Sequence, residues 1–277
     1  MSRFSDRMGI TKPRIEFQLE GMDSELRNCL WNMFYNHYFE PFTHYQNANL
    51  VKVLWNSHFK IPIDTISYTS RDLSTIREHY FKFPWYEVYN LIEFAANNYH
   101  DWDVNQRFIE ACNQVLEREK SGFRFIGKRI TPITDKKEIA EIEEALDSPF
   151  KTVSAHLESA LKLMSDRKSP DFPNSIKESI SSVEAMCRIV CGENATLGKA
   201  LDKIEKEGKI ELHGALKKAF DSLYGYTSTA EGIRHAHGLL EGKSNLSSED
   251  AKFMLISCSA FVNYLKVKAC KAGFKIG

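Results

Sequence analysis

The chain has 277 residues, 43% of them hydrophobic and 27% charged, which is an ordinary composition for a globular protein with room for two domains. Its 37 Lys and Arg residues are matched by 37 Asp and Glu residues, so no overall positive field would attract nucleic acid, and any contact with RNA has to come from a local patch. The sequence contains no run of about 18 apolar residues and no signal-peptide core, so we expect a cytoplasmic protein with no membrane span.

The first half of the chain predicts helices and one β-hairpin. It opens with an irregular or partly extended arm over residues 1–21, after which Asp23 or Ser24 is placed to cap a helix. Residues 123–133 hold two alternating apolar segments on either side of Gly127-Lys128, which is typical of a hairpin. The other predicted helices cover residues 49–59, 71–99 with an interruption at Pro84, 104–120 and 135–146.

The second half of the chain is almost purely helical in pattern. Asp147-Ser148-Pro149 marks the predicted domain boundary. Apolar stripes over 153–164 and 176–190, short helices at about 195–206 and 210–223, and a last helix at about 247–270 favour a bundle. The predicted fold class is therefore mainly α, with an N-terminal α+β domain over residues 1–148 that contains one β-hairpin and a C-terminal helical bundle over residues 149–277.

The chemistry of the chain is concentrated in residues 232–238, where Arg234, His235 and His237 lie between two glycines. An arginine can hold a phosphate in a bidentate fork, and a histidine with a pKa near ~6.5 can exchange a proton at neutral pH. Phosphate binding and proton transfer are two of the functions needed to cleave RNA without a metal. The six cysteines form no Cys-x-x-Cys pair, so the sequence predicts packed thiols, with no metal site and no cofactor motif.

The two halves each resemble a known family. The C-terminal half resembles the HEPN superfamily, and the N-terminal half resembles the AbiJ-type N-terminal domains of bacterial abortive-infection proteins. The first resemblance is carried by residues 175–180, 183–188, 195–201, 223–227, 232–235 and 251–255. The second is carried by residues 4–7, 22–32 and 116–125.

The HEPN resemblance implies a dimer that brings two Arg/His segments into one cleft and cleaves RNA through attack of the ribose 2′-hydroxyl. Arg234 and His235 match the first two positions of the family motif. His237 follows Arg234 by only three residues, which is closer than the family spacing, and no histidine comes later. The catalytic imidazole is therefore His235, His237 or neither.

Other residues are candidates for a supporting role. Glu184 is placed beside the apolar stripe of its helix, where it would orient an imidazole or Arg234, or else pair with Arg188 four residues on. Tyr226 would stack on an RNA base or pack in the bundle. Lys266, Lys268 and Lys271 would contact phosphates or serve as a solvated helix end. Arg124, Lys128 and Arg129 on the hairpin form a weaker basic patch.

We therefore expect a metal-independent endoribonuclease toxin that acts in anti-phage abortive infection, with an Arg/His site formed in a homodimer of the C-terminal bundle. The expected partners are an RNA substrate and a phage trigger or antitoxin-like protein, and the N-terminal domain would sense the trigger or restrain the activity. The alternative is a catalytically inactive HEPN-like module for dimerisation or RNA binding, which the shortened Arg-to-His spacing favours.

Overall fold

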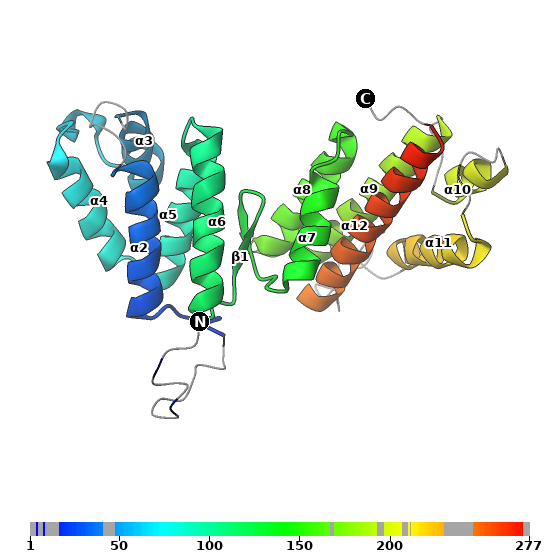
Figure 1. Ribbon diagram of the computed structural model, residues 1–277, viewed down its shortest axis with the longest axis horizontal. Coiled ribbons are helices and arrows are strands. Elements are labelled where there is room, and N and C mark those ends of the chain that lie inside the picture. The colour runs from blue at the N-terminus through cyan, green and yellow to red at the C-terminus, as the bar shows by residue number, and fades with distance from the viewer. Residues whose placement is uncertain are drawn as a thin grey trace, which may run out of the picture. The chain divides into compact units, whose positions relative to one another are not determined.

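A computed structural model of the chain describes residues 17–40, 48–166, 169–192, 197–206, 210, 212–229 and 246–273, together with Phe4 and Met8. The chain divides into two compact units, Met1–Thr134 and Asp135–Gly277. Among the described residues, both units are helical and one two-stranded sheet lies in the first unit (Figure 1), which confirms the predicted mainly α fold with a β-hairpin.

The first unit is built around helices that pack side by side (Figure 1). Asp23 caps the first of them by accepting a hydrogen bond from the Leu26 backbone N–H at 2.7 Å, as predicted. Pro84 separates two of the others, also as predicted. The elements of this unit are α2 (Ser24–Tyr38), α3 (Ala48–Val53), η1 (Leu54–Phe59), η2 (Ile63–Thr65), α4 (Ser70–Lys82), α5 (Trp85–Asn98), α6 (Trp102–Arg118), β1 (Arg124–Ile126) and β2 (Arg129–Thr131).

The core of the first unit is rich in aromatic rings whose polar groups are satisfied internally. Tyr38 is fully buried, its ring centroid lies 4.7 Å from that of Phe108, and its hydroxyl donates to the Asn105 side chain at 2.8 Å. Tyr80 is equally buried and donates to the Arg27 carbonyl at 2.8 Å. Because a buried hydroxyl without a partner is costly, these bonds allow large rings to fill the core.

The helix predicted over residues 49–59 is present, but its second half is π-helical. The α-helical hydrogen bonding stops at Val53, and Leu54–Phe59 form a π-helical turn. The turn ends at Lys60, whose positive φ of 56° places it in the left-handed region and whose backbone N–H donates to the Trp55 carbonyl. In this turn the His58 ring contacts the Phe94 ring of α5, with 5.2 Å between the centroids.

The predicted hairpin is confirmed. β1 and β2 pair antiparallel, and Gly127, the first turn residue, has the positive φ of 54° that a two-residue hairpin turn requires. The hairpin is attached to α6 through Asn113, whose side-chain amide donates to the Phe125 carbonyl at 3.0 Å and accepts from the Phe125 N–H at 2.8 Å. One carboxamide on a helix therefore binds both backbone groups of one strand residue.

The second unit is a helical bundle in its described residues, with α9 at its centre. Helix α9 packs against α8, α10, α11 and α12 and buries residues over much of its circumference. Among the described helices, α12 alone is long and apolar enough to cross a membrane, and half of its apolar window is buried in the bundle, as in a core helix. The elements are α7 (Lys136–Leu146), α8 (Lys151–Ser165), α9 (Phe172–Cys191), α10 (Leu197–Lys206), α11 (Gly214–Thr229) and α12 (Ser248–Lys271).

Helix α7 belongs to this second unit, because the division falls between Thr134 and Asp135. Three polar contacts hold it along α12. Lys252 pairs with Glu138 at 2.6 Å, the Asn263 amide donates to the Glu141 carbonyl at 2.9 Å, and Lys266 Nζ donates to the Glu144 carbonyl at 3.0 Å. Residues 147–149, which mark the predicted boundary, connect α7 to α8 within the unit.

Candidate functional site

The predicted catalytic residues Arg234, His235 and His237 lie outside the described residues, in the segment 230–245. What the structure describes is the pair of helices that flank this segment. Helix α11 ends at Thr229, six residues later than the predicted end at about 223, and α12 begins at Ser248. Tyr226 is therefore part of a helix rather than of a turn before the motif.

The two flanking helices meet at one ring pair. The Phe220 ring of α11 stacks on the Phe261 ring of α12 with centroids 3.5 Å apart and an interplanar angle of 12°. At the end nearer the segment, the pKa of Tyr226 is raised by burial and then by the carboxylate of Asp250. The helices that precede and follow the segment with Arg234 thus belong to the same bundle.

The start of α12 is fixed by a capping box. The Ser247 side chain accepts from the Asp250 backbone N–H at 3.4 Å, and the Asp250 carboxylate accepts from the Ser247 backbone N–H at 2.9 Å. The cap lies two residues after the segment 230–245 and fixes the position at which α12 begins.

Glu184 is buried in α9, with 9% of its surface exposed. It lies close enough to Cys187 for its charge to contribute to the raised pKa of that thiol, after burial and after Cys191. Arg188, the alternative partner, has an exposed side chain. A carboxylate inside the bundle needs a hydrogen-bonded or charged partner, so the setting of Glu184 differs from that of a surface charge.

The predicted RNA-binding residues of unit two occupy different settings. Tyr226 is 36% exposed. Lys266 holds α7, its side chain is only 17% exposed, and its Nζ lies 3.7 Å from the Glu144 carboxylate. The Lys268 ammonium lies 5.7 Å from the centre of the Tyr264 ring, and Lys271 is exposed in the last turn of α12. Lys268 and Lys271 are therefore the better placed of the three lysines for contacts outside the chain.

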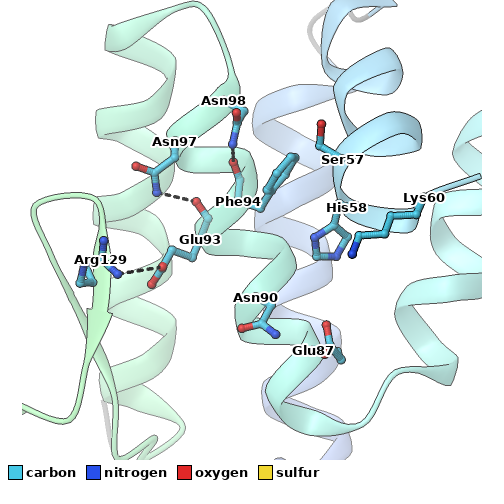
Figure 2. Close-up of a pocket in the computed structure, with 10 residues that line it drawn as sticks. All are labelled: Ser57, His58, Lys60, Glu87, Asn90, Glu93, Phe94, Asn97, Asn98 and Arg129. Atoms are coloured by element: carbon cyan, nitrogen blue, oxygen red, sulfur yellow. Dashed lines mark hydrogen bonds and ion pairs between the residues drawn. The ribbon is translucent and has the colours of Figure 1, made fainter. Parts of the chain in front are cut away.

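Sequence analysis missed a polar cleft in the first unit, with a volume of about 550 Å³ and an open side toward solvent. We call it the α5 cleft. Figure 2 shows it built along α5, with the end of η1 on one side and the hairpin on the other. It is lined by Ser57, His58 and Lys60 from the end of η1, by Glu87, Asn90, Glu93, Phe94, Asn97 and Asn98 from α5, and by Arg129 from β2.

The charges of the α5 cleft are balanced and partly fixed. Glu93 accepts from the Ile130 backbone N–H at 2.6 Å and lies 3.7 Å from the Arg129 guanidinium. Burial raises the pKa of Glu93, and the Ile130 N–H and Arg129 oppose that rise. Burial lowers the pKa of His58, so this imidazole favours its neutral form. The cleft thus combines two cations, two carboxylates, three carboxamides and a neutral imidazole.

One hairpin residue is not where the basic-patch prediction placed it. Arg124 is buried, with 6% of its surface exposed, and donates to the carbonyls of Ser121 and Phe123 at 2.8 and 2.6 Å. Its guanidinium neutralises backbone oxygens inside the unit, so it cannot contribute to a surface patch. Arg129 stays at the surface, but as part of the α5 cleft.

A second constellation that sequence analysis missed is a His–Glu pair in the second unit. His156 Nδ1 of α8 lies 2.7 Å from a Glu178 carboxylate oxygen of α9, and both side chains are about one-quarter to one-third exposed. The carboxylate orients the imidazole, as in general-base pairs. The described residues contain no group of three His, Cys, Asp or Glu side chains arranged to hold a metal ion.

Comparison with known proteins gives one family match. The family model described as AbiJ N-terminal domain 4 matches residues 2–148, which is more than half of the chain. The match therefore covers the whole first unit and α7 of the second. Searches against curated proteins and against solved structures gave no match.

Proposed function

We propose that this chain, which belongs to the AbiJ N-terminal domain 4 family, acts in abortive-infection defence as a metal-independent endoribonuclease. Family membership points to the defence role. The nuclease is our proposal, and the observation that carries it is the sequence of Arg234 and two histidines between α11 and α12, two helices of one bundle.

In this proposal the ribose 2′-oxygen forms a bond to the adjacent phosphorus while the bond from phosphorus to the 5′-oxygen breaks. One imidazole takes the 2′-hydroxyl proton and another gives a proton to the leaving 5′-oxygen. The Arg234 guanidinium neutralises the charge that builds up on the phosphate oxygens. Glu184 is the residue that positions Arg234 and the imidazoles. Tyr226, Lys268 and Lys271 bind the RNA, and Lys266 supports them with its charge.

The proposal includes a homodimer of the C-terminal bundle. On a helix, His235 and His237 would point about 200° apart, so one segment does not readily supply both an acid and a base. A dimer that joins two segments supplies both.

One face of α12 supports a homodimer. Phe253 and Val267 on it are 60% and 45% exposed. The residues at the same helical angle between them carry no charge, and we call the set the α12 outer strip: Phe253, Ile256, Ser257, Ala260, Tyr264 and Val267.

An uncharged strip along about 21 Å of helix that exposes Phe253 and Val267 has the character of a protein interface. It lies opposite the buried residues Met254, Leu255 and Leu265, which face the bundle core. A second copy of the chain, placing the same strip against this one, would cover it. Because the proposed substrate is RNA, the localisation that we propose is the cytoplasm.

The second candidate function is a catalytically inactive bundle that dimerises or binds RNA while a partner carries out the killing. The short spacing from Arg234 to His237 favours it. The two functions differ in whether Arg234 is needed for RNA cleavage, because a module that only binds would not break the backbone.

The test compares wild type with Arg234→Ala, His235→Ala and His237→Ala in a bacterial host, with growth and RNA integrity measured with and without phage. Arg107→Ala is the matched control, because Arg107 is exposed on α6. We expect Arg234→Ala and at least one histidine variant to leave RNA intact and to lose protection, while Arg107→Ala behaves as wild type. Equal protection by wild type and Arg234→Ala would refute the nuclease and support the inactive module.

A further inference from the structure

We propose that the α5 cleft binds an extended peptide segment of a partner protein, with Asn90, Asn97 and Asn98 contacting its backbone and Lys60 pairing with an acidic side chain. Nothing in the nuclease proposal uses this cleft. The further step, that the bound segment is the signal that controls the nuclease, rests on the proposed function, whereas the binding itself does not.

The shape of the cleft fits an extended chain. Its lining on α5 begins at Glu87 and ends at Asn98, which corresponds to about 16 Å along the helix axis. An extended peptide covers that distance with about five residues. Figure 2 shows the exposed face of α5 as the floor, Lys60 and His58 on one side and Arg129 on the other.

The carboxamides of this floor are oriented. The Asn97 Nδ2 donates to the carbonyls of Glu93 and Lys128 at 2.8 and 2.9 Å, and the Asn98 Nδ2 donates to the Phe94 carbonyl at 2.8 Å. These bonds use both N–H groups of Asn97 and one of Asn98, and both side chains present their oxygen atoms as acceptors for N–H groups. Asn90 makes no hydrogen bond to another described residue and can offer both a donor and an acceptor.

The same unit already contains an asparagine that binds the backbone of an extended segment. Asn113, on a helix, bonds both the N–H and the carbonyl of Phe125 in an extended strand. An exposed asparagine on α5 can bond the backbone of an incoming chain in the same way, because a carboxamide and a peptide group have complementary donors and acceptors.

The charges argue for a peptide rather than a polyphosphate. The cations Lys60 and Arg129 are matched by Glu87 and Glu93, and Arg129 already lies against Glu93. A triphosphate or an RNA backbone would bring several negative charges close to both carboxylates. Lys60 forms no ion pair with a described residue, and its backbone is held by the bond to Trp55, so one acidic side chain is the charge that the cleft accommodates.

An apolar side chain of the peptide also has a place. The Phe94 ring is half-buried in the cleft lining, with its centroid 5.2 Å from that of His58. His58 favours its neutral form, so the two rings form a surface on which an aliphatic or aromatic side chain can pack. The predicted motif is therefore a short extended segment with one acidic and one apolar residue.

The binding test uses the full chain. A displayed library of random peptides of about 12 residues is selected on the wild type and counter-selected on Asn90→Ala, and the recovered peptides are synthesised and titrated by calorimetry. We expect binding that weakens about tenfold or more in Asn90→Ala and in Lys60→Glu, and that is lost when the peptide backbone is N-methylated. Asn56→Ala and Lys52→Glu, exposed positions just before the cleft, are the matched controls and should bind as wild type.

Two results would overturn the proposal. One is that no recovered peptide is sensitive to Asn90→Ala and Lys60→Glu. The other is that the probes ATP or a short oligouridine bind in the cleft instead, with binding lost in Lys60→Glu. Circular dichroism of each variant separates a lost contact from lost folding, so a weakened titration with an intact spectrum counts for the proposal.

The control step is tested in cells. Lys60→Glu and Asn90→Ala should leave RNA cleavage on overexpression unchanged and alter the response to phage, whereas Arg234→Ala should abolish cleavage in both conditions. If Arg234→Ala has no effect, the nuclease proposal fails while the peptide-binding result is unaffected. If the cleft variants respond to phage as wild type does, the cleft does not carry the signal.

Discussion

The two compact units are built from similar helices, yet the surface that we assign to ligand binding in one differs in kind from the surface that we assign to assembly in the other. The first has an aromatic core in which Tyr38 and Tyr80 find internal partners, and its α5 cleft is polar. The second has a core with many aliphatic residues, and its exposed helix face, the α12 outer strip, is uncharged. A polar concave surface selects a ligand by its hydrogen bonds, whereas an apolar convex strip is suited to assembly.

This difference agrees with the separate roles that we propose for the two units. Recognition belongs to the unit that carries most of the AbiJ family match, and assembly and cleavage belong to the bundle. Helix α7 complicates that division, because it lies within the family match and is held to α12 by Lys252, Asn263 and Lys266. A change in the bundle would therefore act on a helix that the family match includes.

The largest expected effect separates the stabilities of the two units. Phe108 is fully buried between Tyr38 and Phe125, so Phe108→Ala should cost about 3–5 kcal/mol of unfolding free energy. All four tryptophans, at positions 31, 55, 85 and 102, lie in the first unit. Denaturation followed by tryptophan fluorescence should therefore show the full loss.

The matched change in the second unit is Leu255→Ala, which removes a fully buried side chain from α12. It should lower stability by about 2–5 kcal/mol in far-ultraviolet circular dichroism while leaving the tryptophan transition in place. If both variants shift the tryptophan transition equally, the units unfold as one, and the comparison between them has no thermodynamic meaning.

The next effect concerns assembly. Phe253→Asp places a charge on a 60% exposed residue of the proposed dimer contact, which should weaken the dimer about tenfold or more in sedimentation equilibrium. Tyr86→Asp, at a 41% exposed aromatic residue of the first unit, is the matched control and should not change association. A wild type that stays monomeric at every concentration would remove the strip from consideration as a homodimer contact.

A smaller effect is expected at the cap of α12. Ser247→Ala removes the acceptor for the Asp250 N–H and should cost about 1 kcal/mol. Faster hydrogen exchange in the first turn of α12 measures it, and RNA cleavage should fall with it if the cap positions residues 230–245. Ser248→Ala, one residue later and outside the cap, serves as the control, and an equal effect of the two changes would count against a specific role of the cap.

The features that sequence analysis predicted correctly are local. Asp135 caps its helix, Pro84 separates two helices and Gly127 turns the hairpin, because each depends on residues within a few positions. The π-helical turn at Leu54–Phe59 and the burial of Arg124 depend on distant packing partners, so no spacing rule revealed them. Glu184 was placed correctly beside an apolar stripe, since its burial follows from helical angle alone.

The α5 cleft shows why the rest could not be predicted. Its lining comes from η1, α5 and β2, which the fold brings together, and only the polar spacing of Glu87, Asn90 and Asn97 is visible in the sequence. That spacing has the appearance of an ordinary solvated helix face. His156 and Glu178 are 22 positions apart and meet for the same reason, through the packing of α8 against α9.

The smallest expected effect tests the setting of the cleft through pH. Burial lowers the pKa of His58, with Glu87 opposing this shift and His79 adding to it. The folded state therefore takes up this proton less readily than the unfolded state does. Stability falls as pH decreases below about 6.5, because unfolded chains then bind protons that folded chains do not.

His58→Phe removes this contribution and keeps a ring in the aromatic cluster. Its stability should change less than that of the wild type between about pH 7.5 and pH 5.5 in tryptophan-detected urea unfolding. An exposed histidine changed in the same way, His100→Phe, should keep the wild-type slope. If His58→Phe also keeps it, the imidazole is not buried as described, and the ring surface proposed for the peptide is lost with it.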